Sequence, residues 1–252
     1  MPLPNISQPC PKICFGSGWL TFGSGKLSKS KEVTQKDVID PRVLSSLYTS
    51  DSIRNFLIGE ISFGQDGPYS QELFLNSFNG ILANKVGNIS SRLNGMVLKY
   101  NGGKIEKPGD MEEIDKSFIA SISALKAESI QNIREFKPTL SYKAALKIID
   151  ECNAYIDNNK PWELAKDEAN KARISTILYY ACQGMLEAYT LLNAFLPEST
   201  AKVLAMFNVN EISIDEKACC NFNIAGLELE KTQPLFARLD INAEVKKLNE
   251  LA

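Results

Sequence analysis

Four stretches of the chain place apolar side chains at every third or fourth position, and this pattern restricts the fold more than any other feature. They run from Phe74 to Tyr100, Met111 to Phe136, Tyr142 to Ile156, and Ile174 to Leu192, with a shorter fifth at 201–207. Apolar stripes of this length, separated by short connections, are typical of antiparallel helical bundles. We therefore predict a mainly α fold built around such a bundle.

Local signals set the expected limits of these helices. Asn101-Gly102-Gly103 predicts a helix end, because glycine enters the left-handed conformation that closes many helices. Ser141 is a predicted N-cap for the third helix, and Ser213-Ile-Asp-Glu216 has the spacing of a capping box. Asp66-Gly67-Pro68 predicts a turn before the bundle. The polar Lys85 interrupts the first apolar stripe.

The beginning and the end of the chain have a different character. Residues 1–24 are rich in proline and glycine, with strand-like pieces at 12–15 and 19–22 that are too short to form a sheet alone. An extended piece at 224–229 and a final helix at 243–251 are expected near the end. The fold prediction is thus a small α/β element followed by the bundle, divided at 1–31, 32–67, 68–212 and 213–252.

Composition excludes several classes of protein. The 252 residues are 44% apolar and 23% charged, which is ordinary for a globular protein, and the net charge of −2 argues against a chain coated with basic residues. No apolar run is long enough to span a bilayer, and no secretory signal begins the chain. We therefore expect a cytoplasmic protein with no membrane or DNA partner.

Histidine is absent, and none of the six cysteines forms a Cys-x-x-Cys pair. A zinc site is therefore not expected, and every histidine-based triad or general base is excluded. The cysteines are interpreted as reduced thiols, most of them buried or incidental.

One loop places charge where a phosphate could bind. Gly25-Lys26-Leu27-Ser28-Lys29-Ser30 combines two mobile ammonium groups with two hydroxyl donors. By its local chemistry alone, such a loop is more often a solvated surface segment than a phosphate-binding one.

The surroundings of this loop, and further motifs along the whole chain, resemble a known family. They are Gly18-Trp19-Leu20 before the loop, Asp40-Pro41 after it, Asp51-Ser-Ile-Arg54-Asn-Phe-Leu, Phe63-Gly-Gln-Asp-Gly67, Asn84-Lys-Val-Gly-Asn-Ile-Ser-Ser-Arg92, Pro161-Trp162-Glu-Leu-Ala-Lys166, and Pro234-Leu-Phe-Ala-Arg-Leu-Asp240. In this order they resemble the methionyl-tRNA synthetases, a family of class I aminoacyl-tRNA synthetases.

The resemblance implies a role for each part of the chain. Residues 1–31 would end the Rossmann-type catalytic domain and carry its signature loop, and 32–67 would contact the tRNA stem. Residues 68–212 would form the anticodon-binding domain, and 213–252 a tail that folds back. The chain would belong to an ATP-dependent methionine–tRNA ligase.

The resemblance also assigns the site residues. Lys29 would be the principal lysine on the ATP phosphates, supported by Lys26, with Ser28 and Ser30 shaping the loop; ATP with Mg²⁺ would be a substrate of the full enzyme. Asn88, Arg92 and Trp162 would recognise the anticodon of methionine tRNA. Asn and Arg can contact bases or phosphates, and Trp can stack on an unstacked base.

A purely structural interpretation of the same residues stays open. A tryptophan after a proline at a helix start often packs in the core, and Asn88 with Arg92 could be a solvated pair on one helix face. Asp51 and Arg54 are interpreted as fixing the segment between the loop and the bundle rather than as a catalytic ion pair.

Three departures from the family pattern bear on activity. Leu27 replaces the usual methionine, which conserves volume, and Ser17 replaces a usual histidine. The nucleotide-binding half with its His-x-Gly-His signature is not in the sequence, so we expect the C-terminal part of an enzyme that cannot activate methionine alone. The alternatives are a free-standing tRNA-binding module and a plain helical interaction domain.

Overall fold

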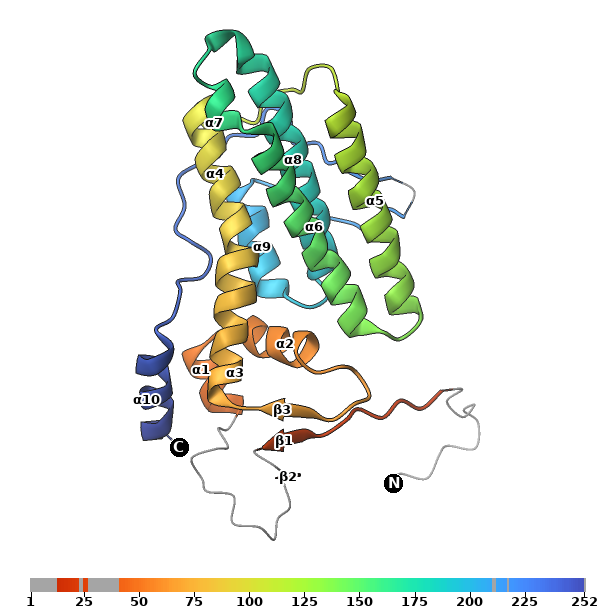
Figure 1. Ribbon diagram of the computed structural model, residues 1–252, viewed down its shortest axis with the longest axis vertical. Coiled ribbons are helices and arrows are strands. Elements are labelled where there is room, and N and C mark those ends of the chain that lie inside the picture. The colour runs from red at the N-terminus through yellow and green to blue at the C-terminus, as the bar shows by residue number, and fades with distance from the viewer. Residues whose placement is uncertain (1–12, 23–24, 27–40, 210–211, 217, 252) are drawn as a thin grey trace.

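The computed structural model describes residues 13–22, 25–26, 41–209, 212–216 and 218–251, and most of them lie in a helical bundle (Figure 1). Its helices run up and down the long axis of the molecule in alternation, with α5 and α8 antiparallel to α6. They are α4 Asn88–Asn101, α5 Glu113–Arg134, α6 Pro138–Asn159, α8 Lys171–Leu192 and α9 Pro197–Met206. The predicted mainly α, antiparallel bundle is confirmed.

A smaller layer lies at one end of the bundle. It contains the helices α1 Pro41–Leu47, α2 Ser50–Gly59 and α3 Gln71–Ser77, with the C-terminal helix α10 Ile241–Leu251 packed beside α3. Apolar side chains of this layer form a core of their own, which includes Phe56, Phe74 and Leu248. The larger core fills the bundle, with Leu93, Ile122, Ile149, Leu178 and Met185 fully buried.

A three-stranded sheet closes the small layer. Strand β1 Leu20–Phe22 pairs antiparallel with β2 Gly25–Lys26 and parallel with β3 Gly67–Tyr69, with Thr21 opposite Pro68. The predicted turn at 66–68 is therefore wrong, because Gly67 and Pro68 pair with β1 and the turn lies earlier, at 63–64. The strand expected at 19–22 is confirmed from Leu20, whereas no strand forms at 13–15, the described part of the other predicted piece.

Gly18 allows the chain to approach the loop before β3. A Cβ atom at this position would lie 1.9 Å from the carbonyl oxygen of Gln65, so no side chain fits there. Next to it, the Trp19 amide donates to Asp66 Oδ1 at 2.8 Å, and the Gly67 amide donates to the Trp19 carbonyl at 2.9 Å. The Gly-Trp-Leu and Asp-Gly motifs are thus joined in space.

The first apolar stretch is one continuous helical column that changes its winding. It begins as α3, widens into the π-helix η2 Phe78–Gly87, and continues as α4. The predicted end at Asn101 is confirmed, with Gly102 in the left-handed conformation at φ 62°. The sequence does not predict these π-turns, because the buried residues Phe78, Leu82 and Val86 follow one another at the spacing of an ordinary α-helix.

Two predicted caps are wrong. Helix α6 begins at Pro138, which suits the first helical turn because it has no amide hydrogen to leave unpaired. Ser141 lies inside that helix, buried against the Ser129 hydroxyl at 2.9 Å. No helix follows Ser213 in the described part of this segment, and Glu216 instead pairs with Arg134 at 2.6 Å.

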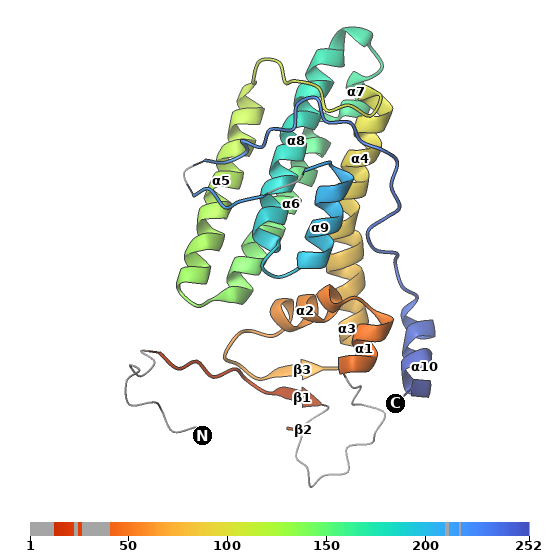
Figure 2. The same ribbon diagram turned by 180° about the vertical axis from the view of Figure 1, so that it is seen from behind.

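The end of the chain ties the two layers together. After α9 it crosses α8 and α5, returns, and runs along α4 to α10 beside α3 (Figure 2). A bridge between Lys104 and Glu228 fixes the extended piece, and the Asn79 amide donates to the Leu239 carbonyl at 2.9 Å. The predicted final helix is confirmed as α10, although the four-part domain division stays a prediction.

Asp51 and Arg54 join α2 to the connection between α8 and α9. The Arg54 guanidinium donates to the carbonyls of Phe195 at 2.7 Å and Ala194 at 3.1 Å. The buried Asp51 carboxylate accepts from the amide and the hydroxyl of Ser199, both at 2.6 Å. These contacts agree with the structural role that the sequence predicted for the two residues.

Candidate nucleic-acid interface

The signature loop falls largely outside the described residues. This applies to Ser28, Lys29 and Ser30, whereas Lys26 is placed by its backbone in β2. Ser17 and Trp19, which precede the loop, are exposed, with 67% of Trp19 accessible. The phosphate-binding roles predicted for the loop therefore stay predictions.

Two of the three predicted anticodon residues meet at the far end of the bundle. The guanidinium carbon of Arg92, on α4, lies 5.9 Å from the ring centroid of Trp162. Trp162 belongs to the short helix α7 Pro161–Leu164, and 38% of it is exposed. A cation over an aromatic face is an attractive arrangement. The ring is therefore partly open to solvent rather than a core side chain.

Two side chains of α6 hold Arg92 in place. The guanidinium donates to Asn153 Oδ1 at 2.9 Å and forms an ion pair with Asp157. Arg92 retains 23% side-chain exposure and Asp157 retains 57%. Sequence reasoning missed both partners, because the two helices are about sixty residues apart along the chain and no motif links them.

Asn88 is exposed four residues before Arg92, at the point where η2 gives way to α4. π-Turns are frequent at functional sites, since they shift the side chains that follow them. The polar Lys85, one turn earlier, pairs with Asp150 of α6 at 2.8 Å. The predicted residues therefore lie on α4 and α7, and α6 supplies polar partners to Lys85 and Arg92.

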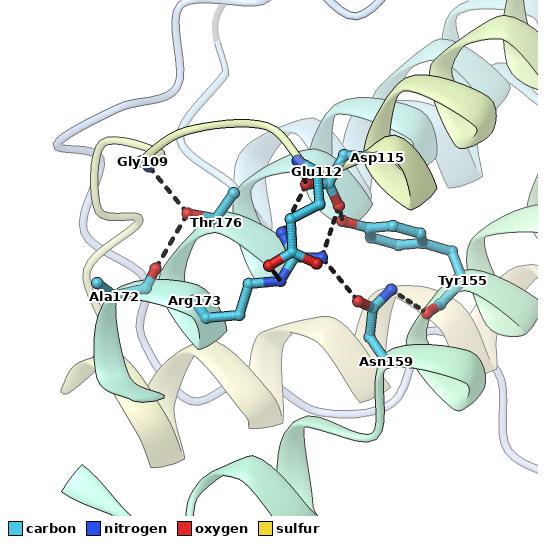
Figure 3. A network of polar contacts seen from close by, with 8 residues as sticks. All are labelled: Gly109, Glu112, Asp115, Tyr155, Asn159, Ala172, Arg173 and Thr176. Carbon is cyan, nitrogen blue, oxygen red and sulfur yellow. Dashed lines mark hydrogen bonds and ion pairs between the residues drawn. The ribbon is translucent and has the colours of Figure 1, made fainter. Parts of the chain in front are cut away.

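A buried polar network fixes the end of α6, just before Trp162 (Figure 3). Arg173 of α8 donates to Asp115 Oδ1 at 2.9 Å and to Asn159 Oδ1 at 2.8 Å. The Tyr155 hydroxyl donates to the same Asp115 Oδ1 atom, and the Glu112 carboxylate lies 3.2 Å from the guanidinium. Three helices therefore meet where Asn159 ends α6 and the chain turns into α7.

The charge of this network is stable at neutral pH. Burial alone would raise the pKa of Asp115, but the hydrogen bonds from Arg173, the Tyr155 hydroxyl and the Glu112 amide together hold this pKa below the usual range of a carboxyl group. Burial raises the pKa of Tyr155, and the Asp115 carboxylate adds to this effect. Asp115 is therefore ionised and Tyr155 neutral, the states that suit the hydrogen bonds observed.

Nothing in the described residues suggests a metal centre or a membrane helix. No group of three or more acidic, cysteine or histidine side chains could hold a metal ion there. No described helix is both long and apolar enough to cross a membrane.

Comparisons with known proteins find similar sequences and structures. A family model described as "tRNA synthetases class I (M)" matches residues 3–94. A methionine–tRNA ligase of Clostridium acetobutylicum is 36% identical over 98% of this chain, and one of Caldanaerobacter subterraneus is 35% identical over 97%. This chain spans 38% of the length of each of these relatives.

Solved structures show the same fold. The apo methionyl-tRNA synthetase of Mycobacterium tuberculosis matches 92% of this chain with a TM-score of 0.78 and 27% identity. The same enzyme bound by methionyl-adenylate matches 82% with a TM-score of 0.73 and 29% identity. These matches cover 44% and 41% of the two solved chains, respectively.

Proposed function

The chain belongs to the methionyl-tRNA synthetase family of class I aminoacyl-tRNA synthetases, and on this premise we propose that it supplies two functions of a methionine–tRNA ligase. The first is to hold the phosphates of ATP during the activation of methionine. The second is to recognise the anticodon of methionine tRNA.

The Lys-Leu-Ser-Lys-Ser loop carries the first proposed function. Negative charge develops on pyrophosphate as it leaves ATP, and a positioned ammonium group stabilises that charge. Lys29 supplies this group and Lys26 supports it, while Ser28 and Ser30 shape the loop. Mg²⁺ enters with ATP, so the chain needs no metal ligands of its own.

The pairing of Arg92 with Trp162 carries the second function. Anticodon bases are splayed out of their stack, and a partly exposed tryptophan offers such a base an aromatic surface. Asp157 and Asn153 hold the guanidinium beside the ring, which reduces the ordering needed when RNA binds. Asn88, exposed on the same helix, can pair with a base edge through its amide.

Catalysis by this chain alone is not part of the proposal. The chain spans 38% of its curated relatives, and the positioning of adenosine and methionine is assigned to the remainder of such an enzyme. We propose that it acts in the cytoplasm with such a catalytic half, fused or separate. Methionine-dependent pyrophosphate exchange above background, abolished by Lys29→Ala, would overturn this view.

The anticodon proposal is tested by Trp162→Ala, with Trp19→Ala as the matched control. Loss of one stacked base costs about 1–3 kcal/mol, so Trp162→Ala is expected to weaken binding of methionine tRNA by about five-fold to 150-fold. The control removes the other, more exposed tryptophan and should bind as the wild type does.

The same tRNA with a replaced anticodon completes the experiment. Wild-type protein should prefer the methionine anticodon, and Trp162→Ala should lose most of that preference while its melting temperature stays near the wild-type value. Unchanged preference in the variant would refute anticodon reading by Trp162. A large fall in melting temperature would instead identify Trp162 as a packing residue.

A further inference from the structure

Two adjacent cysteines lie in the segment between α9 and α10, which crosses the outside of the bundle (Figure 2). The Sγ atoms of Cys219 and Cys220 are 3.8 Å apart. Both side chains are of intermediate exposure, whereas Cys152 and Cys182 of the helices beneath are fully buried. Cys14, the remaining described cysteine, is exposed and far along the chain. The adjacent pair therefore differs from the other described thiols in having a reaction partner within reach of solvent.

The segment that carries the pair is fixed to the bundle on both sides. Lys126 of α5 donates to the Ala218 carbonyl at 2.9 Å, and the Cys220 amide donates to Glu187 of α8 at 2.8 Å. Beyond them, the side-chain amide of Gln183 bonds both the amide and the carbonyl of Phe222, at 2.9 and 2.6 Å. Such contacts keep the two sulfur atoms side by side instead of leaving them on a free loop.

A buried ion pair lies directly under the thiols. Lys126 and Glu187 are 2.8 Å apart, with side-chain exposures of 5% and 1%. The contact with Cys220 lowers the pKa of the Cys219 thiol and, together with the Lys126 ammonium, outweighs burial and the Glu187 carboxylate, which raise it. The same contact, together with burial, raises the pKa of Cys220. Of the pair, Cys219 is therefore the more readily deprotonated thiol, and Cys220 keeps its proton. The thiolate is the nucleophilic form of cysteine.

We propose that Cys219 and Cys220 form a site of reversible oxidation by hydrogen peroxide, with a disulfide between neighbouring residues as its product. The Cys219 sulfur attacks peroxide: an S–O bond forms, the O–O bond breaks, and hydroxide leaves with the proton that the thiol loses, as water. The Cys220 sulfur then attacks the sulfenic acid at Cys219. An S–S bond forms and a second water leaves, so each peroxide consumes both thiol hydrogens.

The product is a readily reduced disulfide because of its geometry. Neighbouring Cα atoms are about 3.8 Å apart across a trans peptide, below the separation of about 4.4–6.8 Å that disulfides usually span. The ring that joins adjacent cysteines is therefore strained, and strained disulfides are the labile ones. The site fits a transient modification in a reducing compartment rather than a structural bridge.

Mass spectrometry of the full chain tests the proposal. After brief treatment with hydrogen peroxide, a peptide containing 219–220 should lose the mass of two hydrogens, and dithiothreitol should restore it. Cys220→Ser should stop at the sulfenic acid, trapped by dimedone at Cys219. Cys219→Ser should abolish the modification, and Cys14→Ser, the control, should leave it unchanged.

A second probe does not depend on peroxide. Phenylarsine oxide bridges two close thiols with release of one water, so one equivalent should bind the wild type and none should bind Cys219→Ser. The proposal fails if peroxide consumes Cys14 before Cys219, if the disulfide joins another cysteine, or if phenylarsine oxide does not bind. These outcomes are read on the wild-type chain, so they hold even where a variant folds poorly.

Discussion

At the scale of the residue, the Asp115 network shows how hydrogen bonds can offset the free-energy cost of burying a charged carboxylate. Asp115 is fully buried and accepts from a guanidinium, a phenol and an amide, which together replace the water that it loses on folding. Arg173, 16% exposed, is the only cation among these partners. Removing the carboxylate charge would leave that guanidinium buried without its main counter-ion.

Asp115→Asn is therefore expected to lower the free energy of unfolding by about 3–5 kcal/mol at pH 7. Because folding lowers the pKa of Asp115, its contribution is complete above the unfolded-state pKa of about 4. The contribution is lost as the pH falls through the lower folded-state pKa. Urea unfolding of both proteins at pH 7 and pH 3 measures this, and the gap between them should narrow at the lower pH.

Asp150→Asn is the matched control for this experiment. Asp150 pairs with Lys85, but its side chain is 52% exposed, and exposed ion pairs contribute about 0–1 kcal/mol. If the two variants lose equal stability, burial is not what makes the Asp115 pair important.

At the scale of the element, the sequence predicts where the helices lie along the chain, but it does not predict which side chains join one helix to another. Apolar spacing predicts the bundle helices, because burial on one face imposes that spacing. The glycines predict the helix end at Gly102, because glycine adopts the left-handed conformation found there. The apolar spacing does not predict the π-turns of η2, because an ordinary α-helix would bury the same apolar residues. It also does not predict the ion pair between Asp157 and Arg92. The turn predicted at Gly67 and Pro68 is wrong, because the pairing of these residues with the distant strand β1 overrides their local preference for a turn.

Helices pack closely around Gly184, in the middle of α8. A Cβ atom there would lie 2.5 Å from Ile122 Cδ1 and 2.8 Å from Phe118 Cζ. Gly184→Ala should therefore destabilise the protein by about 1–3 kcal/mol through overpacking, although alanine favours helices. Thermal unfolding measures this effect.

Gly95→Ala in α4 is the matched control, since nothing lies within 4 Å of its Cβ position. It should stabilise the protein by about 0.4–1 kcal/mol. Two variants with shifts of the same sign would contradict the assignment of Gly184 as a close-packing site.

At the scale of the whole molecule, the tail adds a third connection between two cores that are also joined by α2 and by the column of α3, η2 and α4. It crosses the bundle and then delivers Leu248 of α10 into the core of the small layer, where this side chain is fully buried. The Tyr48 hydroxyl of that layer donates a hydrogen bond to Glu244 Oε2 at 2.5 Å, and Gln71 Nε2 donates one to Asn249 Oδ1 at 3.1 Å. The two cores are therefore expected to unfold together.

Leu248→Ala should lower the free energy of unfolding by about 2–5 kcal/mol while keeping a single transition. Leu57→Ala in α2, where the leucine is 40% exposed, should cost clearly less. Calorimetry is the measurement, and a second, lower transition in the Leu248 variant would show that the small layer unfolds independently.

Helix α10 packs on the small layer as a bound peptide would, except that the chain itself links it to its binding site. A tethered ligand has an effective concentration on the order of millimolar, so a micromolar amount of free α10 peptide should not displace it. Residues 231–234, just upstream, are exposed. Cutting the chain there would leave every contact of α10 intact but would make its occupancy depend on dilution.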